Sequence, residues 1–203
     1  MSGEREESRI TANMLVLELS TMIVAIALAF NAQSLEASGI TVPSLVDFIV
    51  TNVVVVWFWW RYVVERLSYP PRTSEFPVLD IVVLLLISAL PVVMRTGRLV
   101  YLAGLMSGIA FTWAAMLAGV LRDPRVPPEA RADLRQEAYA RSAIGALFAV
   151  SAAVYALFRP LAHAVFAVTV LLLAYRVIIG HVMRRHRSRM LRPRPSRTPP
   201  SAP

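Results

Sequence analysis

The sequence contains neither cysteine nor lysine, and these two absences exclude several kinds of chemistry. A chain without cysteine has no disulfide bond and no thiolate metal site. A chain without lysine cannot bind retinal or pyridoxal phosphate as a Schiff base, and it has no catalytic lysine amine. The three histidines, His163, His181 and His186, are too scattered to predict a metal-ligand cluster.

Motifs of the common enzyme classes are lacking as well. The sequence shows no hydrolytic triad, no phosphate-binding glycine loop, no pair of haem ligands and no paired carboxylates beside a base. We therefore predict a protein that is not an enzyme and that has no cofactor.

Charged residues are scarce, whereas apolar residues are abundant. Only 17% of the residues are charged and 57% are hydrophobic, whereas a soluble domain has about 25% charged residues. This composition is typical of an integral membrane protein. Six apolar segments have about 20 residues each, the length that crosses a bilayer core of about 30 Å. They span about residues 12–32, 43–64, 76–94, 99–121, 138–158 and 161–183.

The fold class predicted from these segments is all-α, with a six-helix transmembrane domain over residues 1–183 in contact with the lipid bilayer. Residues 129–141 are rich in helix formers and predict a cytoplasmic extension of the fifth helix. Residues 184–203 are rich in Arg and Pro and cannot bury a core, so we expect a disordered tail beside anionic lipid headgroups.

All 21 basic residues are arginine, and their distribution predicts the orientation of the chain. Seventeen lie on one side of the six predicted spans and three on the other, and Arg176 lies within the last span. Basic residues near span ends accumulate on the cytoplasmic side. We therefore predict a multi-pass protein of the cell membrane with both termini in the cytoplasm. The net charge of +8 follows from this topology and does not indicate nucleic-acid binding.

Ionisable residues inside the spans need partners, because an unpaired charge in a membrane is costly. Glu18 of the first span and Arg176 of the sixth lie at matching depths near the cytoplasmic side, and Asp80 of the third span lies close to them. We predict an inner-leaflet polar cluster of these three residues that joins three helices. A proton or ion relay is the alternative interpretation.

Four further features predict local structure. Asp47 is interpreted as a cap of the second helix, or alternatively as a charge that attracts cations at a pore mouth. The aromatic residues of segment 57–62 are typical of an interfacial belt. Pro91 should kink or end the third helix, because proline removes a backbone hydrogen bond. Small residues recur in segments 104–119 and 142–153 and predict close helix packing.

The first half of the chain resembles a known family. The segments that carry the resemblance are "LSTMIVAIALAF" (19–30), "VPSLVDFIV" (42–50), "VVWFWWRYVVERL" (55–67) and "LLLISALPVV" (84–93). They resemble the first three helices of the endosomal and lysosomal potassium channels (transmembrane protein 175) and their small prokaryotic relatives. The first-helix Arg-x-x-x-Phe-Ser-Asp signature of that family is degenerate here, with Leu15 at the arginine position and Leu19, Ser20 and Thr21 at the last three positions.

The resemblance implies a homotetramer in which four first helices surround a potassium-conducting pore with a hydrophobic constriction. Ile26 falls at the constriction isoleucine of the family, and Met22, Ala29 and Phe30 lie about one helical turn away on the same face. Taken from the residues alone, the simpler interpretation is that Met22, Ile26 and Ala29 pack against neighbouring helices.

The leading functional prediction is an oligomeric cation channel with potassium as the permeant ion. Two alternatives stay open. The chain could be a non-catalytic accessory or scaffold subunit of a larger membrane complex, since no other site is evident. It could also be a small proton-coupled transporter that uses Glu18, Asp80 and Arg176 as its coupling cluster.

Overall fold

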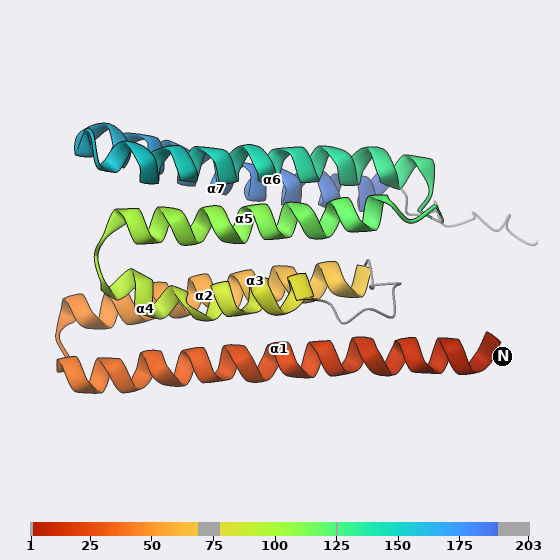
Figure 1. Ribbon diagram of the computed structural model, residues 1–203, viewed down its shortest axis with the longest axis horizontal. Helices are drawn as coiled ribbons and strands as arrows, with labels where there is room; N and C mark the ends of the chain where they lie inside the picture. The colour runs from red at the N-terminus through yellow and green to blue at the C-terminus, as the bar shows by residue number, and fades with distance from the viewer. Residues whose placement is uncertain (1, 69–77, 125, 191–203) are drawn as a thin grey trace, which may run out of the picture. The chain divides into compact units, whose positions relative to one another are not determined.

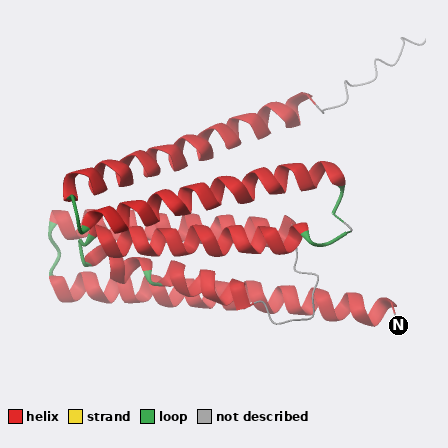
Figure 2. Cartoon of the chain, turned by 45° about the horizontal axis from the view of Figure 1, so that its top comes forward, coloured by secondary structure: helices red, strands yellow, loops and turns green. Residues whose placement is uncertain are grey.

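The computed structural model describes the backbone of residues 2–68, 78–124 and 126–190, and the side chains of residues 14–68, 78–124 and 126–179. These residues form helices and no strand (Figures 1 and 2). The helices are α1 (Ser2–Ser38), α2 (Val42–Ser68), α3 (Val78–Ser88), α4 (Leu90–Arg95), α5 (Leu99–Leu121), α6 (Pro128–Tyr155) and α7 (Arg159–Met190).

Six helical segments are long and apolar enough to cross a membrane. They are Met14–Ser38, Val42–Ser68, Val78–Arg95, Leu99–Leu121, Pro128–Tyr155 and Arg159–Ile179. The third segment combines α3 and α4, and each of the other five lies within one helix. The predicted all-α fold with six potential spans is therefore confirmed.

The chain divides into two compact units, residues 1–166 and residues 167–203, and each is described by itself. Within the first unit, α1 packs beside α2, α3 and α4, while α5 packs beside α3 and α4 on one side and α6 on another (Figure 1). The boundary between the units falls within α7. The contacts among helices α1 to α6 all lie within the first unit.

The core of the first unit consists of apolar side chains repeated at helical spacing. On α2, Val55, Phe58 and Tyr62 follow one another by three or four residues, and all three are buried. The other buried members of this cluster come from α1, α3, α4 and α5: Val24, Val83, Leu84, Ile87, Leu90, Ile109, Trp113 and Met116. The outward faces of the helices are also largely apolar, and they remain exposed, as expected of helices that contact lipid.

One local prediction about α2 is wrong, and a second is corrected for two of its residues. Its N-terminus is capped by Thr41 and not by Asp47, which lies further along the helix and is exposed. The Thr41 N–H donates to Ser44 Oγ at 2.8 Å, and the Ser44 N–H donates to Thr41 Oγ1 at 3.3 Å. The interfacial belt predicted for segment 57–62 does not include Phe58 and Tyr62, since both rings are buried in the core, whereas Trp60 is 58% exposed.

The third span is interrupted next to Pro91, as predicted. Helix α3 ends at Ser88 and α4 begins at Leu90, with Pro91 in its first turn. Proline lacks the N–H that would donate to the carbonyl four residues earlier, so the regular helix is broken here. The break leaves α4 as a separate short helix whose last turn carries Arg95.

Helices α5 and α6 approach closely through small residues, as predicted from their composition. Ser107 Oγ of α5 donates a hydrogen bond to the carbonyl of Gly145 in α6 at 3.0 Å. A Cβ atom added to Gly145 would lie 3.3 Å from Ala110 Cβ and 3.3 Å from the ring of Phe111. The absence of a side chain at Gly145 therefore permits this contact.

Helices α6 and α7 extend beyond the predicted spans. The helical extension predicted for residues 129–141 is confirmed, since α6 runs without interruption from Pro128 to Tyr155. At 1.5 Å per residue, α6 measures about 42 Å, which exceeds the apolar core of a bilayer. Helix α7 continues to Met190, past the predicted end of the sixth span at residue 183. Residues 191–203 of the predicted tail lie outside the described residues.

Candidate functional site

Helix α1 has one face that packs on the other helices and one face that does not. Ser20, Val24, Ala27 and Asn31 are buried, and their spacing of three or four residues places them on one stripe. Because α1 packs on α2, α3 and α4, this stripe is its contact with the rest of the first unit.

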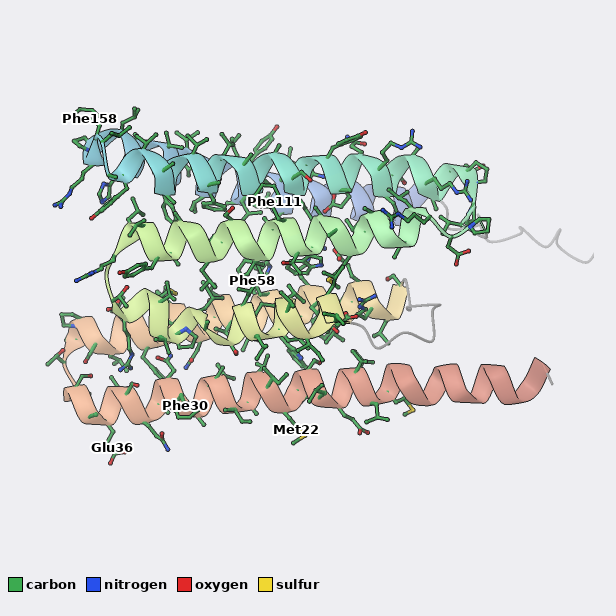
Figure 3. The ribbon with its side chains drawn as sticks, viewed as in Figure 1. Met22, Phe30, Glu36, Phe58, Phe111 and Phe158 are labelled. Atoms are coloured by element: carbon green, nitrogen blue, oxygen red, sulfur yellow. The ribbon has the colours of Figure 1, made fainter. Side chains whose placement is uncertain are left out.

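The four residues predicted to line a pore lie together on the opposite face of α1. Met22, Ile26 and Phe30 are 62%, 53% and 59% exposed, and Ala29 is exposed as well. Figure 3 shows Met22 on the side of α1 that points away from α2, α3 and α4. This exposed face is therefore available to lipid or to a second copy of the chain.

Polar residues lie at both ends of the same face. Glu18 lies about 12 Å along the helix from Ile26, and Glu36 lies about 15 Å from Ile26 in the other direction, at 1.5 Å per residue. Both carboxylates and the amide of Gln33 are exposed. Within the described part of the first unit, Glu18 has no hydrogen-bonding or ionic partner. The exposed face is thus apolar at its centre and acidic towards both ends.

The three residues of the degenerate signature have different surroundings. Ser20 is fully buried, Leu19 is half-buried and Thr21 is exposed. The Ser20 hydroxyl donates to the carbonyl of Leu17 at 2.7 Å and accepts from Trp59 Nε1 of α2 at 3.3 Å. Thr21 donates only within its own helix, to the same carbonyl at 3.0 Å. Ser20, the one residue retained from the signature, therefore links α1 to α2.

Asp80 has a different ionic partner from those proposed from the sequence. The carboxylate is buried, and its Oδ1 atom accepts from Tyr62 Oη at 2.8 Å and from the guanidinium of Arg66. Its Oδ2 atom is buried and has no hydrogen-bond partner within the described part of the chain. Arg176 belongs to the second unit, so its predicted contact with Glu18 stays a prediction.

A second ionic contact joins α2, α5 and α6 through Glu65. The carboxylate accepts from Trp113 Nε1 at 2.7 Å and from Arg141 Nη1 at 3.0 Å, and Arg141 Nη2 bonds to its other oxygen. Arg61, one turn earlier on α2, lies with its Nη2 atom 3.4 Å from Glu65 Oε1. The guanidinium carbon of Arg141 also lies 4.7 Å from the centre of the Trp113 ring.

Glu137 extends these contacts along α6, with oxygen-to-nitrogen distances of 3.0 Å to Arg141 and 3.9 Å to Arg61. We use the name ionic network for two groups together, the pair Arg66 and Asp80 and the group Arg61, Glu65, Glu137 and Arg141. It contains three charges of each sign and joins α2 to α3, α5 and α6. Its charges are mutually compensated, so its chemistry suits holding helices together better than binding an ion.

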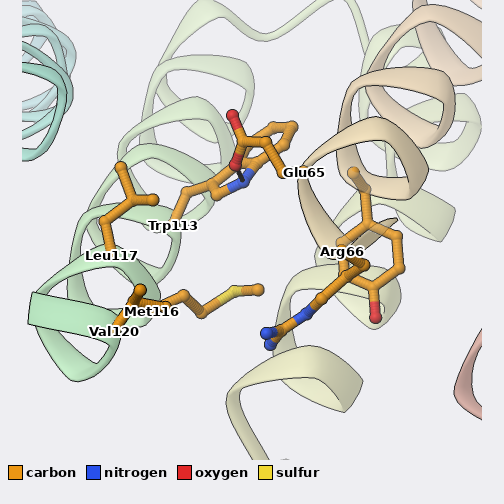
Figure 4. A pocket seen from close by; sticks show the side chains of 7 residues that line it. Glu65, Arg66, Trp113, Met116, Leu117 and Val120 are labelled. Atoms are coloured by element: carbon orange, nitrogen blue, oxygen red, sulfur yellow. Dashed lines mark hydrogen bonds between the residues drawn. The ribbon is translucent and has the colours of Figure 1, made fainter. Parts of the chain in front are cut away.

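A small recess opens beside the ionic network between α2 and α5 (Figure 4). Figure 4 shows the indole of Trp113 bonded to Glu65, with Arg66 on the α2 side and apolar side chains of α5 opposite. The recess has room for about one water molecule, which is too little for an organic substrate. Its lining residues are Tyr62, Glu65, Arg66, Trp113, Met116, Leu117 and Val120.

The ionic network was missed by sequence reasoning, apart from Asp80. Its arginines were used to predict the orientation of the spans and were not considered as ionic partners. Glu65 lies near the end of a span, where a charged residue is common and needs no special explanation. One signal could have identified the pairs. Glu65 and Arg141 lie towards the arginine-rich side of their predicted spans, as do Arg66 and Asp80, so residues of opposite charge share a depth.

Comparison of the chain with models of protein families, with characterised proteins and with solved structures gives no match. Function is therefore inferred from the geometry of the described helices and from the residues of the first three helices.

Proposed function

We propose that the chain is a subunit of an oligomeric cation channel whose copies place the exposed face of α1 around a common axis. The observation that carries this proposal is the composition of that face. It presents Met22, Ile26, Ala29 and Phe30 at its centre and carboxylates towards both ends, and the first unit leaves it uncovered.

The position of Glu18 favours a face that lines a water-filled path and argues against a face that only contacts lipid. An apolar face alone would be satisfied by lipid, but a carboxylate inside a span is costly unless it meets water or a partner. Thr21, its neighbour on this face, satisfies its own hydroxyl within the helix, whereas Glu18 does not. Water between copies of α1 would hydrate the Glu18 carboxylate.

The same arrangement supports conduction of cations. Acidic side chains at the two ends of the path would attract cations and repel anions, as rings of Asp or Glu do in cation channels. At the centre, Ile26 and its apolar neighbours would form a constriction that closes by losing water. Potassium as the permeant ion and fourfold symmetry are the parts of the proposal that rest on the resemblance of the first three helices.

The experiment is potassium flux through the purified chain in liposomes. Wild-type protein should conduct, and Ile26→Asn should increase the conductance because a polar side chain keeps water in the constriction. The matched control is Leu85→Asn, which places the same amide on an exposed position of α3 away from the proposed axis. The control should leave the conductance unchanged.

A chain that stays monomeric in detergent and lipid and passes no cation would overturn the proposal. Equal effects of Ile26→Asn and Leu85→Asn would contradict the assignment of the α1 face. Copurification of a different chain at fixed stoichiometry, without flux, would instead favour an accessory subunit. Flux that requires a proton gradient would favour the transporter.

A further inference from the structure

Three polar residues of α1, α2 and α4 meet on the buried face of α1, away from the proposed pore. Asn31 is 2% exposed, and its Nδ2 atom donates to Asn52 Oδ1 of α2 at 2.8 Å and to the Phe48 carbonyl at 3.4 Å. Arg95 Nη2 of α4 donates to the Asn31 carbonyl at 3.0 Å and lies 3.4 Å from Asn31 Oδ1. We call Asn31, Asn52 and Arg95 the Asn31 node.

The Asn31 node is unusual within the contact surface of α1, which is otherwise mainly apolar. Val24, Ala27 and the half-buried Ile23 and Leu28 pack on the neighbouring helices without directional bonds. In a membrane, apolar side chains gain little by contacting one another in place of lipid, so they specify the rotation of a helix weakly. A buried Asn that bonds to a partner Asn is a known device for fixing the register of packed helices.

Few other polar contacts fix α1 to the first unit. Between described side chains of the first unit, the remaining interhelical hydrogen bond of α1 is the one from Trp59 to Ser20, at 3.3 Å. The Asn31 node supplies several bonds and draws on two different helices. Arg95 reaches α1 from the short helix α4, which exists because the third span is broken at Pro91.

We propose that the Asn31 node sets the rotation of α1 about its own axis, so that Asn31, Asn52 and Arg95 are positioning residues for the exposed face. Asn31 and Phe30 are adjacent in sequence and point in different directions, one into the node and one outward. Any rotation that releases Asn31 therefore moves Phe30, Ile26 and Met22 as well. The role of the node in conduction rests on the proposed function, but its role in fixing the rotation of α1 does not.

The test uses the absence of cysteine, which allows single-cysteine reporters without background reactivity. Val24→Cys reports the buried face of α1, and Val83→Cys reports a buried position of α3 that does not belong to α1. Each reporter is combined with Asn31→Leu, which removes the amide at similar volume. The full chain in detergent is treated with N-ethylmaleimide, and the rate of modification is measured. The matched background is Gln33→Leu, the same chemical change on the exposed face of α1.

In the Asn31→Leu background, modification of the Val24→Cys reporter should accelerate by at least about threefold to twentyfold, the range expected for loss of a single interhelical hydrogen bond in a membrane, because the substitution removes the bonds of the Asn31 amide to both Asn52 and Phe48. Modification of the Val83→Cys reporter should not change, and Gln33→Leu should leave both rates unchanged.

An unchanged rate for the α1 reporter would overturn the proposal. Equal acceleration of the α1 and α3 reporters would also overturn the proposal, because equal rates would show a general loosening of the first unit and not a rotation of α1. These rates do not depend on conduction, so they separate failure of the node from failure of the channel.

Discussion

Glu65 is the residue on which the arginine-rich end of the first unit depends most directly. Its carboxylate has three described partners, Arg61, Trp113 and Arg141, from three helices, and it lies largely out of water. A charge pair in such a place is costly to break, because the partner that remains keeps its charge without compensation. Replacement of both charged residues by apolar side chains can nevertheless cost little free energy of unfolding, since apolar side chains need no partner.

Glu65→Leu should therefore lower the free energy of unfolding by about 2 to 3 kcal/mol, near the low end for breaking a buried pair, because Glu137 still contacts Arg141. The double variant Glu65→Leu/Arg141→Leu should be more stable than Glu65→Leu alone, because it also removes the buried guanidinium that has lost its bonds to Glu65 and leaves Glu137 beside Arg61. Unfolding in mixed micelles with increasing denaturing detergent measures both values.

The exposed Glu129 in the first turn of α6 provides the control for this pair. Glu129→Leu removes the same charge outside the ionic network and should change the stability by no more than about 0.5 kcal/mol. If the double variant were less stable than Glu65→Leu, the ionic network would contribute net stability, and apolar side chains could not replace this pair without loss.

At the scale of helices, the contact between α5 and α6 depends on the lack of a side chain at Gly145. Gly145→Leu should destabilise the first unit by about 1 to 3 kcal/mol, the usual cost of overpacking, because the new atoms meet Ala110 and Phe111 at once. Gly104→Leu on α5 is the matched control, since a Cβ atom at Gly104 would have no neighbour within 4 Å. The same unfolding titration should show little change for Gly104→Leu, and equal losses for both variants would contradict this packing.

The sequence predicts helices well in this chain but not their partners. Span length and the position of Pro91 follow from rules that act along the chain, and both are confirmed. The partners of Asp80 and Asn31 depend on which helices are neighbours and how each is rotated, and a single sequence does not contain that information. Segment 57–62 shows the same limit, because its aromatic composition fits either an interface or a core.

Helix α1 has both kinds of feature, some that the sequence predicts and some that it does not. Its apolar periodicity and the resemblance identify Met22, Ile26 and Phe30 as a set, and the structure places them on one exposed face. The spacing of four residues from Glu18 to Met22 and from Met22 to Ile26 places Glu18 on this face as well. Its exposure was not predicted, because a charged residue within a span is expected to point towards other helices. Asn31 shows no signal in the sequence beyond being polar within a span.

At the scale of the whole molecule, the arginine distribution predicts that both termini lie in the cytoplasm. Single cysteines introduced by Ser2→Cys and Ser201→Cys should react with a membrane-impermeant maleimide only from the cytoplasmic side of membrane vesicles. A cysteine introduced by Ala37→Cys, near the end of α1, should react only from the opposite side. Labelling of Ser2→Cys and Ser201→Cys from different sides would show an odd number of spans and contradict the topology.

The proposed channel requires that copies of the chain meet along the exposed face of α1. Disulfide cross-linking of single-cysteine variants in native membranes, under mild oxidation, measures this contact directly. Ile26→Cys should give a covalent dimer, because this position faces the common axis. Val24→Cys, on the buried face of α1, and Phe111→Cys, exposed on α5, should remain monomeric. An unlinked Ile26→Cys, or equal cross-linking of Phe111→Cys, would show that the copies do not meet along this face.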